Sequence, residues 1–77
     1  LAAELAPDRI RVNMVAPGVV RTPLHAGVDV DAFGGIALLN RVGEGAEIAE
    51  AVRYLAGAEF VTGHILPVDG GFVAGRA

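Results

Sequence analysis

Residues 10–22 read Ile10-Arg11-Val12-Asn13-Met14-Val15-Ala16-Pro17-Gly18-Val19-Val20-Arg21-Thr22, and this stretch decides the fold of the 77-residue chain. Its first part is β-branched and apolar and becomes continuously apolar toward Ala16, a pattern typical of a strand covered on both faces in a parallel sheet. Pro17 fixes φ and Gly18 has no side chain, so the backbone can turn sharply and let a flat ligand approach. Because ligands in open α/β sheets bind at the carboxyl ends of strands, we expect a binding site at this turn.

The residues around this stretch predict alternating helices and strands. Residues 1–6 form an Ala/Leu/Glu-rich helical pattern that Pro7 ends, and the chain opens inside that pattern without a capping residue. The weakly patterned segment from Pro23 to Asn40 predicts a loop with one or two short helical turns, of a length more typical of a functional loop than of a connector. Further along, the sequence predicts an amphipathic helix at Ala46–Ala56 closed by Gly57, a short strand at Ile65–Val68 and a turn at Asp69-Gly70-Gly71. Since Pro67 donates no hydrogen bond, that strand should lie at an edge or leave this position unpaired.

Composition narrows the class of protein. Hydrophobic residues make up 53% and charged residues 19%, with 11 glycines and no cysteine, which is typical of a globular interior with tight turns. The net charge is −3 and the arginines are scattered, so we expect no nucleic-acid partner. No apolar run approaches the ~20 residues that span a bilayer, so we expect no membrane association. The lack of cysteine excludes disulfides and is compatible with the cytoplasmic location we expect.

Several motifs occur together in a fixed order. They are Leu-Ala-x-Glu-Leu-Ala in the first helix, the Ile10–Thr22 stretch, Arg41-x-Gly43-Glu44, Glu47-Ile48-Ala49, Tyr54-Leu55, Val61-Thr62-Gly63 and Val68-Asp69-Gly70-Gly71. This series closely resembles the carboxyl-terminal third of short-chain dehydrogenases/reductases. The resemblance implies an α/β fold of the Rossmann type, a doubly wound parallel sheet of which residues 1–77 supply the last two strands and one to two helices. It also implies that residues 23–42 form the substrate-binding loop.

The same resemblance implies a role for particular residues in binding NAD or NADP. Pro17 and Gly18 would line the nicotinamide end, the backbone of Val20 would hydrogen-bond the carboxamide, and Thr22 would bind near the carboxamide and the pyrophosphate. In the substrate-binding loop, the candidates for substrate contact are Leu24, His25 and Phe33.

The family's catalytic residues are expected to lie before residue 1. The Gly-rich cofactor fingerprint, the catalytic serine and the Tyr-x-x-x-Lys pair are all missing here, so we expect the chain alone to be inactive. Tyr54 cannot replace that pair, because the chain contains no lysine, and we expect this side chain to pack against the sheet. The family resemblance further implies a homo-oligomer, a dimer or tetramer, with subunit contacts through Ala46–Ala56 and Ile65–Val68.

Other candidate sites carry less weight. Histidine side chains can carry protons or bind metals, but His25 and His64 lack ligand spacing, so we expect no metal site. Asp29 and Asp31 are interpreted as solvated loop residues rather than a catalytic pair, and Asp69 as the anchor of its turn. The Gly43-Glu44-Gly45 sequence is not interpreted as a dinucleotide fingerprint, because Ile48 occupies the place of its third glycine and no strand is predicted before it.

The family resemblance implies one function, and the residues leave a second one open. The first is an NAD(P)-dependent oxidoreductase that transfers a hydride between nicotinamide and a carbonyl or alcohol substrate, with this chain supplying part of the nicotinamide pocket and the substrate loop. The alternative is a non-catalytic remnant or binding protein that acts through the interface helix and the last strand.

Overall fold

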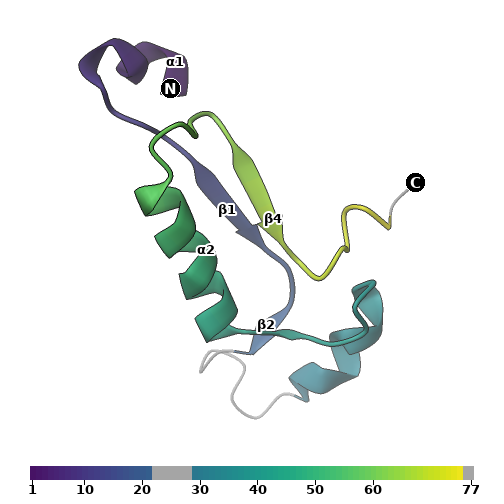
Figure 1. Cartoon of the computed structure of the whole chain (residues 1–77). Coiled ribbons are helices and arrows are strands. Elements are labelled where there is room, and N and C mark those ends of the chain that lie inside the picture. Colours follow the sequence, from purple (N-terminus) through teal and green to yellow (C-terminus); the bar gives the residue numbers. More distant parts are fainter. Residues whose placement is uncertain (22–28, 76–77) are drawn as a thin grey trace.

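The computed structural model describes residues 1–21 and 29–75 as an α/β arrangement in which one long helix lies along a pair of parallel strands (Figure 1). Helix α1 and a 3-10 turn, η1, open the chain, and the short 3-10 helix η3 lies at the opposite end of the molecule from them. The elements are α1 (Ala2–Leu5), η1 (Ala6–Asp8), β1 (Met14–Pro17), β2 (Val20–Arg21), η3 (Val30–Ile36), β3 (Gly43–Glu44), α2 (Gly45–Gly57) and β4 (Ile65–Val68).

The strands form two short parallel ladders. Strand β1 pairs with β4, with Met14 opposite Ile65 and Pro17 opposite Val68, and β2 pairs with β3. The carbonyls of His64 and Val68 accept hydrogen bonds from the amides of Met14 and Gly18. Since successive residues of a strand face opposite neighbours, the nitrogen of Pro67 faces away from β1. The expectation that Pro67 occupies an unpaired edge position is therefore confirmed within the described residues.

The first helix and the first strand are shorter than the sequence pattern predicts. The α-helix ends at Leu5, and a 3-10 turn carries the chain through Pro7 to Asp8. Strand β1 begins at Met14 rather than at residue 10, because residues 12 and 13 are bonded to the loop before β4. In this loop, the Thr62 hydroxyl accepts the amide of Val12 at 3.1 Å. The loop thereby fixes how the chain enters β1.

Helix α2 is confirmed with bounds one residue wider at each end than predicted. Its amino end is fixed by the Glu44 amide, which donates to the Glu47 carboxylate at 3.0 Å. At its carboxyl end, the guanidinium of Arg11 donates to the carbonyl oxygens of Leu55 and Ala56, each at 2.7 Å. Arg11, in the segment before β1, thus satisfies carbonyls at the end of the helix. In many other helices the backbone of a glycine in the left-handed conformation does this.

The exposed face of α2 corrects the expectation that Tyr54 packs against the sheet. Leu55 is buried, whereas Val52, three residues earlier, is 53% exposed. Tyr54 is 60% exposed and does not pack against the sheet, because its position on the helix points away from the face that carries Leu55.

The hydrophobic core of the described residues is small. Only Val20, Val30, Val42 and Leu55 are buried hydrophobic side chains. The parallel pairing of β1 with β4 is confirmed. Met14 of β1 and Ile65 of β4 are each more than half exposed, so residues 1–21 and 29–75 do not cover both faces of these strands. The sheet therefore presents apolar surface that the described residues leave uncovered.

Strands β2 and β3 were not predicted. Gly43 lies against Val20, and the Gly43 amide donates to the Val19 carbonyl at 2.9 Å. With two residues in each strand, the pair is too short to produce an alternating pattern in the sequence. Strand β3 consists of the first two residues of the Gly43-Glu44-Gly45 sequence, and the element before it is η3, so no strand among the described residues directly precedes this sequence, as expected.

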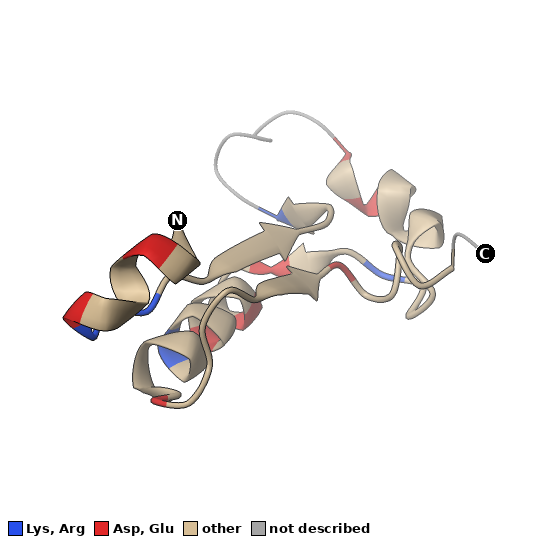
Figure 2. Cartoon of the chain, turned by 90° about the horizontal axis from the view of Figure 1, so that it is seen from above, with Lys and Arg blue, Asp and Glu red and all other residues tan. Residues whose placement is uncertain are grey.

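Charged residues are spread over the length of the described chain rather than gathered on one face (Figure 2). None of the helices in residues 1–21 and 29–75 is long and apolar enough to cross a membrane.

Candidate functional site

A pocket of about 700 Å³ lies at the carboxyl ends of β1 and β4. The Pro17-Gly18 turn lines one part of it, and Phe33 of η3 lines another. The remaining wall is largely apolar, with Leu38, Ile48 and Phe72 among its residues. The structure thus brings together three of the residues that the sequence singled out, on two elements that are separate in the chain.

Gly18 is held close to the backbone that follows β4. A Cβ atom on Gly18 would lie 2.8 Å from the Asp69 Cα and 2.9 Å from the Asp69 Cβ, distances that real Cβ atoms essentially never show. The Gly18 amide also donates to the Val68 carbonyl at 3.0 Å. The absence of a side chain at Gly18 is therefore needed for close packing between the ends of the two strands. The sequence did not reveal this requirement.

Asp69 anchors the turn on the other side of this contact, as expected. Its carboxylate accepts the amides of Gly71 at 2.9 Å and Val73 at 3.0 Å. Backbone hydrogen bonds, above all from Val73, lower the pKa of the Asp69 carboxyl. Gly70 and Gly71 have φ of 63° and 91°, left-handed values that favour glycine, so the turn needs both residues.

Val20, which the family resemblance places at the cofactor carboxamide, is not among the residues that line the pocket. The residue is buried, with 8% of its surface exposed. Because the neighbouring Val19 carbonyl accepts the Gly43 amide, the N–H and C=O of Val20 itself face away from β3. This orientation presents a donor and an acceptor side by side on the edge of β2.

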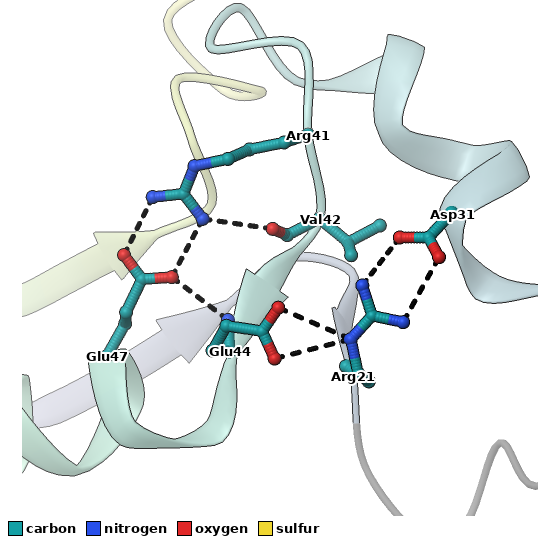
Figure 3. A network of polar contacts seen from close by, with 6 residues as sticks. All are labelled: Arg21, Asp31, Arg41, Val42, Glu44 and Glu47. Atoms are coloured by element: carbon teal, nitrogen blue, oxygen red, sulfur yellow. Dashed lines mark hydrogen bonds and ion pairs between the residues drawn. The ribbon is translucent and has the colours of Figure 1, made fainter.

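An ion-pair network ties η3 to the β2–β3 ladder (Figure 3). Two terminal nitrogens of Arg21 donate to the Asp31 carboxylate at 3.1 and 2.6 Å, while its Nε contacts both Glu44 oxygens at 3.3 Å. These carboxylates raise the pKa of the Arg21 guanidinium, Asp31 more than Glu44. In turn, hydrogen bonding from Arg21 lowers the pKa of Asp31.

A second pair joins the loop before β3 to the first turn of α2 (Figure 3). Arg41 donates to both oxygens of Glu47 at 2.8 Å and to the Val42 carbonyl at 3.0 Å. The hydrogen bonds from Arg41, together with the Glu44 amide, lower the pKa of Glu47 to about 2. The same pairing raises the pKa of Arg41.

Not every sequence-predicted residue can be compared with this site. Thr22, Leu24 and His25 lie outside the described residues. His64 is exposed, and its amide donates to the Asn13 side chain at 3.0 Å, away from the pocket. Within residues 1–21 and 29–75, no group of three or more His, Cys, Asp or Glu side chains could hold a metal ion.

Sequence reasoning missed the polar residues that join the elements. Arg11 and Asn13 interrupt an otherwise apolar stretch, which was a signal that these side chains have specific partners. The three-residue spacing between Glu44 and Glu47 also resembles that of a helix-capping pair, in which the later acid accepts the earlier amide.

Parallel strands, a crossing helix and a pocket at the strand ends define an α/β domain portion of the Rossmann type. The family model described as Enoyl-(Acyl carrier protein) reductase matches residues 1–73. The chain belongs to the short-chain dehydrogenase/reductase family.

Known proteins of this family match nearly the whole chain. The 3-oxoacyl-[acyl-carrier-protein] reductase of Mus musculus is 45% identical over 71 residues, which is 92% of this chain and 30% of that protein. A short-chain dehydrogenase/reductase of Serratia marcescens, solved as a double mutant, is 43% identical with a TM-score of 0.79, over 92% of this chain and 31% of that one. The structure of ElxO with NADP bound is 30% identical with a TM-score of 0.84, over 95% of this chain and 33% of that one. The chain thus spans about 30% of the length of the curated relatives it matches.

Proposed function

We propose that this chain is the carboxyl-terminal portion of a single NAD(P)-binding domain in an oxidoreductase that transfers a hydride between nicotinamide and a carbonyl or alcohol substrate. The observation that carries the proposal is the Pro17-Gly18 turn, which lines the pocket at the carboxyl end of β1 together with Phe33. In open α/β sheets this end of the strands is where cofactors bind.

The residues present fit a nicotinamide cofactor. Pro17 and Gly18 line the pocket where a flat ring would lie, and the side of Gly18 that a Cβ would occupy is already filled by Asp69. The N–H and C=O of Val20 point away from β3, a donor and an acceptor suited to a carboxamide. Thr22, one residue after β2, would add a hydroxyl near the carboxamide and pyrophosphate. When bound, the cofactor supplies the hydride, and this chain binds and orients it.

Under this proposal, residues 23–42 form the substrate-binding loop, with Leu24, His25 and Phe33 as its candidates for substrate contact. Phe33 is 47% exposed and lines the pocket, so it offers an aromatic face to an apolar carbonyl compound. This chain contributes no catalytic residue, and the serine, tyrosine and lysine of the family would come from elsewhere in the domain.

We also propose that α2 and β4 contribute a contact between subunits of a homo-oligomer. Val52 and Tyr54 on α2 and Ile65 on β4 are each more than half exposed. Large exposed apolar side chains on neighbouring elements are typical of interaction surfaces. The same observation supports the second candidate function, a non-catalytic protein whose role is association.

A chimera tests the first proposal. The segment of the Mus musculus 3-oxoacyl-[acyl-carrier-protein] reductase that aligns with this chain is replaced by this chain, and NADPH oxidation is followed with a 3-oxoacyl thioester. We expect turnover, and we expect Thr22→Val to weaken NADPH binding because it removes one hydroxyl. A folded chimera that binds no NADPH would contradict the proposal and favour the non-catalytic alternative.

A further inference from the structure

The strongest unassigned feature is the contact between Arg21 and Asp31, because it joins the end of β2 to the 3-10 helix that carries Phe33. Arg21 directly precedes Thr22 and lies in the β2–β3 ladder, whereas Asp31 is the second residue of η3. The guanidinium reaches Asp31 with two nitrogens and Glu44 with a third (Figure 3). We propose that Asp31 is a positioning residue, which holds η3 on Arg21 and so sets the place of Phe33 in the substrate pocket.

The first support is how little else holds η3 within the described residues. Val30 and Gly34 are its only buried members. At Gly34, an added Cβ would lie 3.2 Å from the Arg41 Cα, so this end of η3 packs closely on the loop before β3. At the other end Val30 is buried and Asp31 adds the ion pair with Arg21, and Phe33 lies between the two attached ends.

The second support is the geometry of the ion pair. Two parallel hydrogen bonds between a guanidinium and a carboxylate fix both the distance and the relative orientation of the partners. Glu44 binds the third guanidinium nitrogen, Nε, so the guanidinium cannot rotate without breaking a second contact. Glu44 of β3 therefore fixes the orientation of the guanidinium that binds Asp31 of η3.

The ion pair is solvent-accessible, with the Arg21 side chain 46% and the Asp31 side chain 64% exposed. Exposed pairs contribute little to global stability and are weakened by salt. Because of this, the expected effect is on the placement of one short helix and not on the folding of the domain.

The test uses the chimera described above, with acetoacetyl-N-acetylcysteamine as an uncharged 3-oxoacyl thioester and NADPH at saturation. This substrate choice rests on the proposed function. The variant is Asp31→Asn, and the matched control is Asp8→Asn, the same change on the other 3-10 turn, where the described residues give the Asp8 side chain no polar partner.

We expect Asp31→Asn to raise KM for the thioester roughly two- to fivefold, the effect of losing one exposed ion pair, with kcat and NADPH affinity unchanged. Added NaCl should raise the wild-type KM toward the variant's value and should leave the KM of the variant unchanged. The control should keep the wild-type KM and its salt dependence. Equal KM values for wild type and Asp31→Asn at low salt would overturn the proposal.

A second measurement does not depend on turnover. Amide hydrogen exchange across residues 30–37 should be at least roughly twofold faster in Asp31→Asn than in wild type, and unchanged in Asp8→Asn. Unchanged exchange in Asp31→Asn would overturn the positioning role even in a chimera without activity. Conversely, a chimera that binds no NADPH but shows the expected exchange would refute the proposed function and leave the positioning role standing.

Discussion

Adding one methyl group at Gly18 should separate the ends of β1 and β4. In Gly18→Ala the new Cβ would lie 2.8 Å from the Asp69 Cα and 3.3 Å from the Asp69 carbonyl oxygen, so backbone atoms must move. Gly18 is not among the residues with positive φ, so the cost is steric and not conformational. Overpacking of this kind costs roughly 1 to 3 kcal/mol of unfolding free energy.

Urea unfolding of the chimera measures this cost from the shift in midpoint at constant slope. The matched control is Gly45→Ala at the start of α2, where an added Cβ meets no atom within 4 Å. Since alanine is favoured over glycine in helices, this control should be neutral or stabilised by up to roughly 1 kcal/mol.

A second background isolates the backbone contact. Introduced into Asp69→Ala, the Gly18→Ala change should still destabilise, because the Asp69 Cα and carbonyl remain in place. Wild-type stability of Gly18→Ala in the unmodified chimera would refute the close-packing argument.

Three further predictions use the same chimera. Arg11→Met should lower the unfolding free energy by roughly 1 to 2 kcal/mol, because the last carbonyls of α2 lose a charged donor. Arg9→Met, at an exposed position, is the control and should not lower it. Urea unfolding measures both variants, and equal losses would contradict the capping role of Arg11. The pKa of Glu47 is about 2, below its ordinary value of 4.5, so the unfolded state binds more protons between these pH values. The contribution of Glu47 should be fully present above about pH 4.5 and lost as the pH falls through about 2; Glu47→Gln should flatten the unfolding free energy across this window, and an unchanged slope would argue against it. Tyr54→Glu should shift the protein to smaller assemblies in light scattering while Val73→Glu does not, and an unchanged mass for Tyr54→Glu would exclude α2 from the subunit contact.

The sequence pattern predicted the elements that depend on regular apolar spacing. The helix at Gly45–Gly57 and the strand at Ile65–Val68 follow from periodicity and from the glycine and proline signals beside them. Parallel pairing of Met14–Pro17 was predictable because continuous apolar residues are typical of such strands.

The contacts that depend on tertiary structure could not be predicted. Arg11 reaches helix-end carbonyls 44 and 45 positions further along the chain, a separation that local patterns do not report. Tyr54 and Val52 are exposed because nothing in residues 1–21 and 29–75 covers that side of α2, whereas the sequence predicted that Tyr54 packs against the sheet.

The candidate site divides in the same way. The family resemblance placed Pro17 and Gly18 at the nicotinamide end and Phe33 in the substrate-binding loop, and all three line the same pocket. The sequence predicted that the lack of a side chain at Gly18 lets a ligand approach. In the structure, a side chain at this position would instead collide with the Asp69 backbone. The ion pair between Arg21 and Asp31 had no signal in the sequence beyond two charged residues near a loop.

A crystal structure of the chimera with NADP⁺ tests the central claim most directly. The account predicts the nicotinamide ring against Pro17 and Gly18, with its carboxamide hydrogen-bonded to the main chain of Val20. A nicotinamide bound elsewhere, with the Pro17-Gly18 turn remote from it, would contradict the account.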